Sequence, residues 1–493
     1  MTTTSVKRYL SLILAVVFII LFQDSFVHAQ KADRSGPPEL GPPSALKLPP
    51  VQHFALSNGL KVVLMEKHEL PLIQIELIVM AGSAMDPEGK QGLASMTSAL
   101  MEDGAGTRNA LQFADAIDYL GADISSVAGQ HTSAVVLHTP FSKLDSALAL
   151  FSDVAQRPLF PAEELERLRK ERLTSLQQWH DRPSSIASVI FNRTLYGTKH
   201  PYGIPSIGDE KSIRAFRVED LKSFHEQYFG SNNTTIIVVG DVTKSSIEPK
   251  LEMAFGRWKS ASKPQVLWPA IQQVKEKKII LVDKPGAAQS EIRIGRIGVQ
   301  RLTEDYFPLI VMNTILGGSF TSRLNQNLRE QHGYSYGAGS PFSFRPLPGP
   351  FVASAAVQTA VTDKALVEFV KELTNILQPV SDEELTRATN YLALGYPDNF
   401  QSIAQIAREI EDLIMYNLPD DYLNNYIRNV LAVTKEDVNR VAKKYIDPEK
   451  SSIIIVGDRA QIEKSVSALN LAPVEYMSVD DVLGKAPVLD SEK

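Results

Sequence analysis

An internal duplication constrains the fold of this chain more than any other feature of the sequence. The segment "VEDLKSFHEQYFGSNNTTIIVVGD" (218–241) is matched by "KEDVNRVAKKYIDPEKSSIIIVGD" (435–458). In both copies an Asp precedes a Tyr by eight residues, and a Gly follows that Tyr after twelve. A second pair, "EELER" (163–167) and "EELTR" (383–387), is offset by 220 residues against 217 for the first. The chain is therefore predicted to consist of two homologous halves.

The two halves are predicted to be separate domains, because two copies are too few to form a solenoid. We place them at residues 51–265 and 275–472, followed by a polar tail at 473–493. Alternating runs such as "LIQIELIVMAG" indicate strands, and helical stretches follow them. The expected fold class is α+β, with helices covering one face of a mainly antiparallel sheet in each domain. Such a duplicated domain is expected to enclose a cleft, as a two-domain clamshell.

The N-terminal residues have the features of an export signal. Lys7 and Arg8 precede the apolar run "YLSLILAVVFIILF", and "VHA" ends at Ala29. This pattern predicts a secretory signal peptide at residues 1–29 and an exported protein, periplasmic or extracellular. An uncleaved anchor is the alternative, but the run is short for a bilayer core of roughly 30 Å. Residues 30–50 are rich in Pro and predict an extended linker.

Composition excludes several classes of function. The 493 residues have a formal net charge of −6, so no basic field points to nucleic acid as a partner. The chain contains no cysteine, which excludes disulfides, zinc fingers and a Cys nucleophile.

The stretch "GLASMTSALMEDG" (92–104) is predicted to be a helix with a small-residue face. Leu93, Met96 and Leu100 recur at helical spacing and should face the core. The other face should then carry Ser95, Ser98, Ala99 and Glu102. On composition alone this face is an ordinary packing surface.

The context of this helix resembles a known family. The segments "SNGLKVVLMEKHELPLIQIELIVMAGSAMDPEGKQGLA", "RPLFPAEELERLRKE" and "YGTKHPYG" are similar to the N-terminal half of the pitrilysin or insulinase-like (M16) metallopeptidases. In the second half, "NTILGGSFTSRLNQNLREQHGYSYG" (313–337) is the most specific match. The resemblance covers nearly all of residues 51–472, and it includes the subunits of the mitochondrial processing peptidase.

In active members of that family this helix carries His-x-x-Glu-His, whose two His bind zinc while the Glu acts as general base. The corresponding positions here are Ser95, Ser98 and Ala99. The family's third ligand, a Glu, should fall near 174–176, where no carboxylate stands, although Glu171 lies one turn earlier. The resemblance therefore implies that this chain binds no metal and lacks its own zinc hydrolase activity.

No other residues in the sequence form an obvious replacement site. The remaining histidines include no i,i+4 pair, and His200 in "KHPYG" corresponds to a conformational motif of the family. Serine catalysis by Ser95 or Ser98 would need an adjacent base, and the sequence places no His to serve. The two hydroxyls are better interpreted as neutral replacements for ligands.

The second half retains residues to which the resemblance assigns a role. Arg329 and Tyr336 in "LREQHGYSY" correspond to an Arg and a Tyr that reach across the cleft and bind the peptide backbone. The alternatives are a surface salt bridge for Arg329 and a core position for Tyr336, with Tyr334 as substitute if the register shifts. Arg323 is interpreted as structural. No Gly-Lys-Ser/Thr follows Gly317 and Gly318, so a close backbone approach is expected rather than a phosphate loop.

These features predict a non-catalytic, substrate-binding subunit of an exported M16-type zinc endopeptidase. Its partner would be a homologous subunit that carries His-x-x-Glu-His and the zinc, and the substrate would be an extended peptide. One alternative is a peptidase-derived binding or scaffold protein without a proteolytic role. A stand-alone hydrolase is the third hypothesis.

Overall fold

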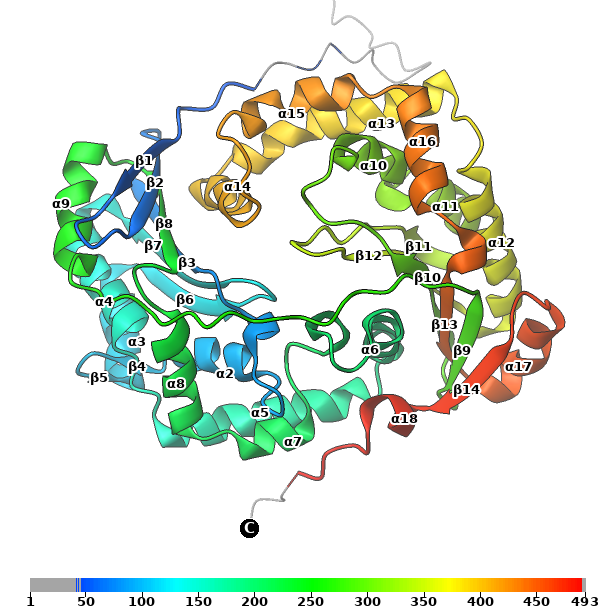
Figure 1. The fold of residues 1–493 in the computed structure, drawn as a ribbon, viewed down its shortest axis with the longest axis horizontal. Coiled ribbons are helices and arrows are strands. Elements are labelled where there is room, and N and C mark those ends of the chain that lie inside the picture. The colour runs from blue at the N-terminus through cyan, green and yellow to red at the C-terminus, as the bar shows by residue number, and fades with distance from the viewer. Residues whose placement is uncertain (1–40, 42, 44–45, 490–493) are drawn as a thin grey trace, which may run out of the picture. The chain divides into compact units, whose positions relative to one another are not determined.

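The computed structural model describes residues 41, 43 and 46–489 (Figure 1). The predicted signal peptide and most of the predicted linker lie outside these residues. Within them, no helix is both long enough and apolar enough to cross a membrane.

The first half is built on a six-stranded sheet in the order β1-β2-β8-β3-β7-β6. Only the β2–β8 pairing is parallel, and the other pairings are antiparallel. The strands are β1 (Gln52–Ala55), β2 (Lys61–Glu66), β3 (Leu72–Val79), β6 (Asp123–Ala128), β7 (Ser133–Pro140) and β8 (Thr234–Gly240), with a separate pair β4 (Gly104–Ala105) and β5 (Arg108–Asn109).

The second half is built on a sheet in the order β11-β12-β10-β13-β9-β14. Here β13–β9 and β14–β9 are parallel and the rest antiparallel. The strands are β9 (Lys278–Asp283), β10 (Gln289–Ile297), β11 (Ser335–Gly339), β12 (Pro350–Gln358), β13 (Ser452–Gly457) and β14 (Val474–Ser478).

Helices connect the strands in both halves. In the first half they are α2 (Leu93–Leu100), α3 (Ala110–Leu120), α4 (Leu144–Gln156), α5 (Ala162–Trp179), α6 (Pro183–Tyr196), α7 (Glu210–Ala215), α8 (Val218–Tyr228) and α9 (Lys244–Phe255). In the second half they are α10 (Tyr306–Asn313), α11 (Arg323–Asn325), α12 (Thr362–Asn375), α13 (Asp382–Gly395), α14 (Ile403–Met415), α15 (Tyr422–Leu431), α16 (Lys435–Tyr445), α17 (Arg459–Ala468) and α18 (Val479–Leu483). Short helical turns are η1 (Ser83–Met85), η2 (Phe141–Lys143), η3 (Pro201–Gly203), η4 (Thr314–Gly318), η5 (Gln326–Gln331), η6 (Thr359–Val361), η7 (Tyr396–Phe400) and η8 (Pro448–Lys450).

The duplicated segments form equivalent elements. The first copy forms α8 and then β8, and the second forms α16 and then β13. Each of these strands pairs in parallel with the first long strand of its half, β8 with β2 and β13 with β9. The predicted fold class, two homologous α+β domains with mainly antiparallel sheets, is therefore confirmed.

Each sheet is apolar on both faces, which its own helices cannot cover alone. In β2 and β8 consecutive residues such as Val62 and Val63 are both buried, although they point to opposite faces. Helices of the same half cover one face of each sheet, as the sequence predicts. The structure goes further than the prediction, because the second face is covered as well.

A helix from the opposite half covers that second face. In the first sheet Met65 and Ile78 pack in one cluster with Ile406 and Ile410 of α14. In the second sheet Ile280 and Val456, among others, pack with α6, whose Ile190 is buried there. This reciprocal exchange, visible in Figure 1, joins the described residues from Pro43 onward into one compact unit.

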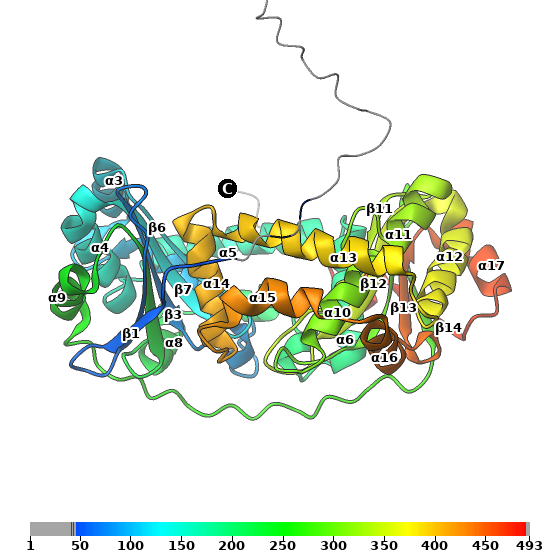
Figure 2. The same ribbon diagram turned by 90° about the horizontal axis from the view of Figure 1, so that it is seen from above.

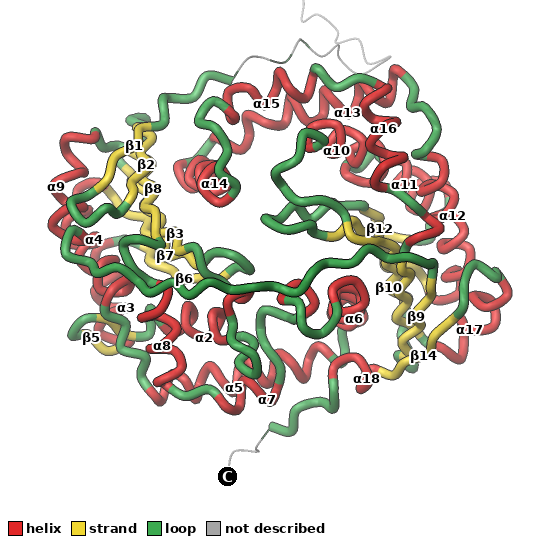
Figure 3. Tube along the Cα trace, in the orientation of Figure 1, coloured by secondary structure: helices red, strands yellow, loops and turns green. Residues whose placement is uncertain are grey.

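The halves are connected by a segment without helix or strand, residues 256–277, which runs as a long extended chain in Figure 2 and as a green loop in Figure 3. Side-chain hydrogen bonds fix it at two points. Trp268 Nε1 donates to the carbonyl of Ala84 at 3.2 Å, and Gln273 Nε2 donates to the carbonyl of Ile297 at 2.8 Å.

Candidate peptide-binding site

The start of α2 is fixed by one carboxylate. Asp86 accepts hydrogen bonds from the backbone N–H groups of Gly92 at 2.7 Å and Ala94 at 2.8 Å. Gly92 has a φ of 91°, and a Cβ there would lie 2.4 Å from the carbonyl oxygen of Ile207. Only glycine meets both demands. Sequence reasoning missed Asp86, because it lies six residues before Gly92, outside the spacing of a capping box.

The core-facing side of α2 is as predicted. Leu93, Met96 and Leu100 are each no more than 3% exposed and belong to the core of the first half. Ser98 is also buried, and its hydroxyl has no hydrogen-bond partner among the described residues. Ser95 and Ala99 are half-buried.

Glu102 does not share this face, because α2 ends at Leu100 and Glu102 lies in the following turn. The expectation that it would extend the helical face is wrong: Gly104 at φ 113° turns the chain shortly afterwards. Burial raises the pKa of Glu102 to about 7, and the neighbouring charges of Asp103 and Asp123 add to the shift.

The part of α5 where the family has its third zinc ligand carries two hydroxyls, and both donate hydrogen bonds to carbonyls of the same helix. Thr174 Oγ1 donates to the carbonyl of Lys170 at 2.8 Å, and Ser175 Oγ donates to the carbonyl of Glu171 at 2.9 Å. Leu176 packs against the core of the first half. The Glu171 carboxylate is 2.7 Å from Arg167, so it is paired within its own helix.

These residues do not fit the zinc that active members of the family bind. Zinc requires imidazole, thiolate or carboxylate ligands, whereas the α2 face offers two hydroxyls and a methyl group. Across the described residues, no group of three His, Cys, Asp or Glu side chains is arranged to hold a metal ion. We therefore derive no hydrolytic step through zinc on this chain.

Serine catalysis has no support in the local geometry either. A nucleophilic serine needs a base within hydrogen-bond reach. In the part of the chain that the structure describes, the hydroxyls of Ser95 and Ser98 form no hydrogen bond with a histidine or a carboxylate.

His200 has a structural role, in agreement with its interpretation as part of a conformational motif. It is 1% exposed, its Nδ1 accepts a hydrogen bond from the Tyr202 N–H at 3.0 Å, and its ring stacks on Tyr196. Burial lowers the pKa of His200, and the nearby charge of Arg345 lowers it further. The neutral ring therefore fixes the turn η3.

Arg329 and Tyr336 lie in neighbouring elements at the edge of the second sheet. The Arg329 guanidinium lies 4.3 Å from the centre of the Phe320 ring and donates to Glu330 at 2.7 Å. A surface ion pair, the alternative considered for Arg329, is thus present. About a third of the Arg329 side chain is exposed.

Tyr336 is 92% exposed on β11, which excludes the core position that was its alternative. Tyr334 takes that position instead, since it packs against the core of the second half and stacks on His332. Among the described residues, no hydrogen bond or ion pair joins Arg329 or Tyr336 to α2 or to each other.

Neighbouring residues support the segment that carries this pair. Arg323 forms a bidentate ion pair with Glu384, at 2.7 and 3.0 Å, which agrees with its structural interpretation. Burial would raise the pKa of Glu384, but Arg323 and the hydrogen bonds from Ser381 together outweigh it and hold the pKa at about 2. A Cβ on Gly317 would lie 2.7 Å from the backbone nitrogen of Ser340, so a glycine permits the expected close approach.

Comparisons with known proteins agree with this arrangement. Two models of one family match: "Insulinase (Peptidase family M16)" over residues 61–203, and "Peptidase M16 inactive domain" over residues 215–392. A Rickettsia felis protein named uncharacterized zinc protease is 24% identical over 81% of this chain and 96% of its own length. The Helicobacter pylori non-peptidase homolog YmxG is 20% identical over 81% of this chain and 92% of its own length.

The fold is also found in solved structures. A crystal structure of the peptidase M16 inactive domain from Pseudomonas fluorescens matches with a TM-score of 0.76 and 28% identity, over 83% of this chain and 98% of that one. A protease from Helicobacter pylori matches with a TM-score of 0.75 and 21% identity, over 83% of this chain and all of that one. The two family models cover both halves, and the chain belongs to the insulinase, or M16, peptidase family as an inactive-type homologue.

Proposed function

We propose that this protein is the non-catalytic, substrate-binding subunit of an exported M16 zinc endopeptidase. The observation that carries the proposal is the contrast between the two halves. Neutral groups occupy the ligand positions on α2, whereas Tyr336 remains almost fully exposed beside a partly exposed Arg329. The phenol and the guanidinium are therefore accessible to a ligand, whereas the α2 face carries no group that binds zinc.

In this proposal the chain binds an extended peptide while a homologous subunit with His-x-x-Glu-His supplies the zinc. Arg329 would donate charge-assisted hydrogen bonds to a peptide carbonyl. The Tyr336 hydroxyl would stabilise the oxyanion that develops at the scissile bond in the partner's site. The strand β11 lies at the outer edge of its sheet beside both residues, which is the place where an extended peptide could add to the sheet.

Two other functions have some support. The name of the Helicobacter pylori relative, non-peptidase homolog, is compatible with a binding or scaffold protein that has no proteolytic role. The names of several other relatives, such as the Rickettsia felis protein, would favour a hydrolase. The ligand positions of this chain argue against the latter.

Co-expression with a homologue that carries His-x-x-Glu-His tests the proposal. We expect the two chains to co-elute in size-exclusion chromatography, and we expect peptidase activity of the mixture to exceed that of the homologue alone. The purified chain alone should contain no stoichiometric zinc and cleave no peptide. Chelator-sensitive cleavage by the single chain would support the stand-alone hydrolase. If the homologue neither associates with this chain nor changes in activity, the binding or scaffold protein is supported.

A further inference from the structure

A cavity of about 370 Å³ lies where a loop of the second half meets the first half. Its volume is within the range of small-ligand sites. Polar and apolar side chains line it together, and its lining includes Gln130, Trp179, Ser188, Asn192, Tyr202 and Arg345. The lining contains no carboxylate.

Arg345 is the charged residue of this cavity, and its surroundings hold it in place. Its guanidinium lies 4.6 Å from the centre of the Tyr202 ring. The Tyr202 hydroxyl accepts a hydrogen bond from the Leu347 N–H at 3.3 Å, and Tyr196 Oη donates to the Pro348 carbonyl at 3.0 Å. The loop that carries Arg345 is therefore pinned to the first half at three points. Stacking uses the face of the guanidinium and leaves the N–H groups at its edge available.

The charge of Arg345 is not balanced by the residues around it. Among the described residues no carboxylate forms an ion pair with Arg345, and its buried Nη1 has no hydrogen-bond partner. The nearby histidines are neutral near pH 7, because burial lowers the pKa of His131 to about 4 and also lowers that of His200, and Arg345 adds to both shifts. A partly buried cation without a partner is costly unless an anion approaches it.

We infer that this cavity binds a carboxylate of the peptide that the chain holds, either an acidic side chain or a C-terminal carboxylate. The inference rests on the proposed function, which it deepens by naming a preference for acidic peptides. The guanidinium edge of Arg345 would form a bidentate pair with the carboxylate. Asn192 and Ser188 add further polar groups to the same lining.

The position of the cavity fits a peptide ligand. Gly129 and Gln130, which line it, directly follow β6. This strand is the outer edge of the first sheet, so its free backbone groups can pair with an extended peptide. A peptide paired with β6 would bring one of its residues to the mouth of the cavity.

Peptide binding to the purified chain alone tests the inference by fluorescence anisotropy. Three fluorescein-labelled decapeptide pools are used: one with a central Glu and a C-terminal amide, one with a central Gln and an amide, and one with a central Gln and a free C-terminal carboxylate. We expect a pool with a carboxylate to bind at least about tenfold more tightly than the Gln amide pool. The Glu pool and the free-carboxylate pool distinguish the two sources of the group.

Substitutions then assign the preference to the cavity. Arg345→Gln should abolish the difference between pools, and Arg345→Lys should retain part of it, because the charge remains but the planar fork is lost. Arg387→Gln, at an exposed arginine on α13, is the matched control and should keep the full preference. Thermal melts verify that each variant folds.

The outcomes separate the two proposals. If all three pools bind equally, or if Arg345→Gln and Arg345→Lys both keep the preference, the carboxylate site is overturned while peptide binding stands. If no pool binds at all, the proposed peptide-binding function fails, and the inference fails with it.

Discussion

Asp86 and Asp305 lie at comparable places in the two halves, yet their carboxyl groups have opposite pKa shifts. Each follows the second long strand of its half and precedes the next helix, α2 or α10. Each also lies near the Tyr that ends the duplicated helix, Tyr228 in α8 or Tyr445 in α16. Burial raises the pKa of Asp86 to about 7, whereas the pKa of Asp305 is held at about 2.

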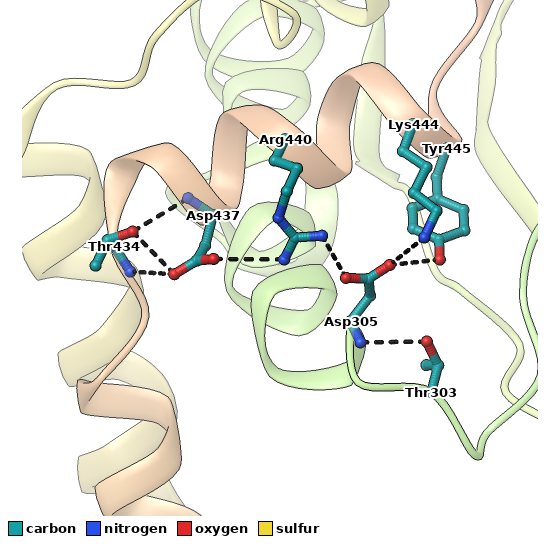
Figure 4. Close-up of polar contacts among 7 residues, drawn as sticks. All are labelled: Thr303, Asp305, Thr434, Asp437, Arg440, Lys444 and Tyr445. Carbon is teal, nitrogen blue, oxygen red and sulfur yellow. Dashed lines mark hydrogen bonds and ion pairs between the residues drawn. The ribbon is translucent and has the colours of Figure 1, made fainter.

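The cations that surround Asp305 explain the difference. Burial alone would raise its pKa, but Lys444 and Tyr445 each donate a hydrogen bond at 2.7 Å, and Arg440 donates another (Figure 4). The 217-residue offset of the duplication places Ser223 and Gln227 at the positions of Arg440 and Lys444. Asp86 therefore has only backbone N–H groups as partners, and these do not outweigh its burial.

The comparison shows that the same position in a duplicated domain can hold a buried carboxyl group with two different sets of hydrogen-bond donors. In the second half, cations on a neighbouring helix fix Asp305 in its ionised form across the neutral range. In the first half, the same position responds to pH within that range, and it supports the helix whose zinc ligands have been replaced. Among the described residues, the first half thus has neither a group of side chains that could hold a metal ion nor the cations that stabilise the ionised carboxylate in the second half.

The largest effect is expected from Asp305→Ala. It removes the shared hydrogen-bond partner of Arg440, Lys444 and Tyr445. We expect the free energy of unfolding to fall by about 2 kcal/mol, which is less than for a fully buried pair because Arg440 and Lys444 are about half exposed to water. Urea denaturation at pH 7 measures this. Asp382→Ala is the control, because Asp382 pairs with Lys435 on the surface and its loss should cost less than about 1 kcal/mol. Equal costs for the two variants would show that the cluster around Asp305 is not a stabilising unit.

Arg329→Ala tests the functional side of the comparison, in which the second half keeps what the first has lost. A hydrogen bond from a charged group is worth about 1.5–3 kcal/mol, so kcat/KM of the reconstituted complex should fall about tenfold to a hundredfold. Tyr336→Phe should act mainly on kcat, because an oxyanion contact exists only in the transition state. Arg387→Ala is the matched control. Unchanged kinetics in a complex confirmed by sizing would make the pair structural, and collapse of the complex would make it an assembly element.

The sequence predicted the two-domain fold because that fold depends on patterns that are local in the sequence. The duplicated segments and the alternating strands required two α+β domains, and Leu93, Met96 and Leu100 identified the buried face of α2. The exchange of α6 and α14 between halves was not predictable from periodicity. An apolar helical face shows that it must be buried, but not which sheet it covers.

The site was predicted in part, and what could not be predicted depends on contacts between residues that are distant in the chain. The family resemblance identified Ser95 and Ala99 as the positions of two zinc ligands and Ser98 as the position of the general base. The partners of Arg345 could not, since Tyr202 is 143 residues distant in the chain and only the folded loop brings the two together. The signal peptide, the partner subunit and export remain predictions.

The pH dependence of stability distinguishes the two carboxylates. The pKa of Asp86 in the fold, about 7, lies above its ordinary value of 3.8, so its favourable contribution is full below pH 4 and is lost as pH rises through 7. For Asp305 the sign is opposite: its contribution is present above pH 4 and is lost as pH falls through about 2. We expect the difference in unfolding free energy between wild type and Asp86→Asn to change by on the order of 2 kcal/mol from pH 5 to 8.

The difference between the two proteins is the quantity to measure, because Glu102 also has a pKa of about 7 and contributes to the wild-type curve. Asp305→Asn provides the comparison, and its difference from wild type should be constant over the same pH interval. A constant difference for Asp86→Asn as well would mean that Asp86 is ionised throughout, and that the two halves do not differ in this respect.

The smallest effect, and the sharpest use of the duplication, is expected from moving the cations of the second half into the first. Ser223 and Gln227 are exposed on α8, so Ser223→Arg with Gln227→Lys should be tolerated. The new arginine would lie three residues after Asp220, as Arg440 lies after Asp437, and that pair is 3.4 Å apart in the second half. The imported charges should lower the pKa of Asp86 and move its pH-dependent loss of stability toward acid. The gain in the free energy of unfolding at pH 8 should be below about 1 kcal/mol, because the new side chains begin at exposed positions and water screens them.

The reciprocal variant, Arg440→Ser with Lys444→Gln, should raise the pKa of Asp305 and make the stability of the second half sensitive to pH. If the first exchange leaves the pH profile unchanged while the reciprocal exchange alters it, the opposite shifts arise from the depth of burial of Asp86 rather than from its missing cations.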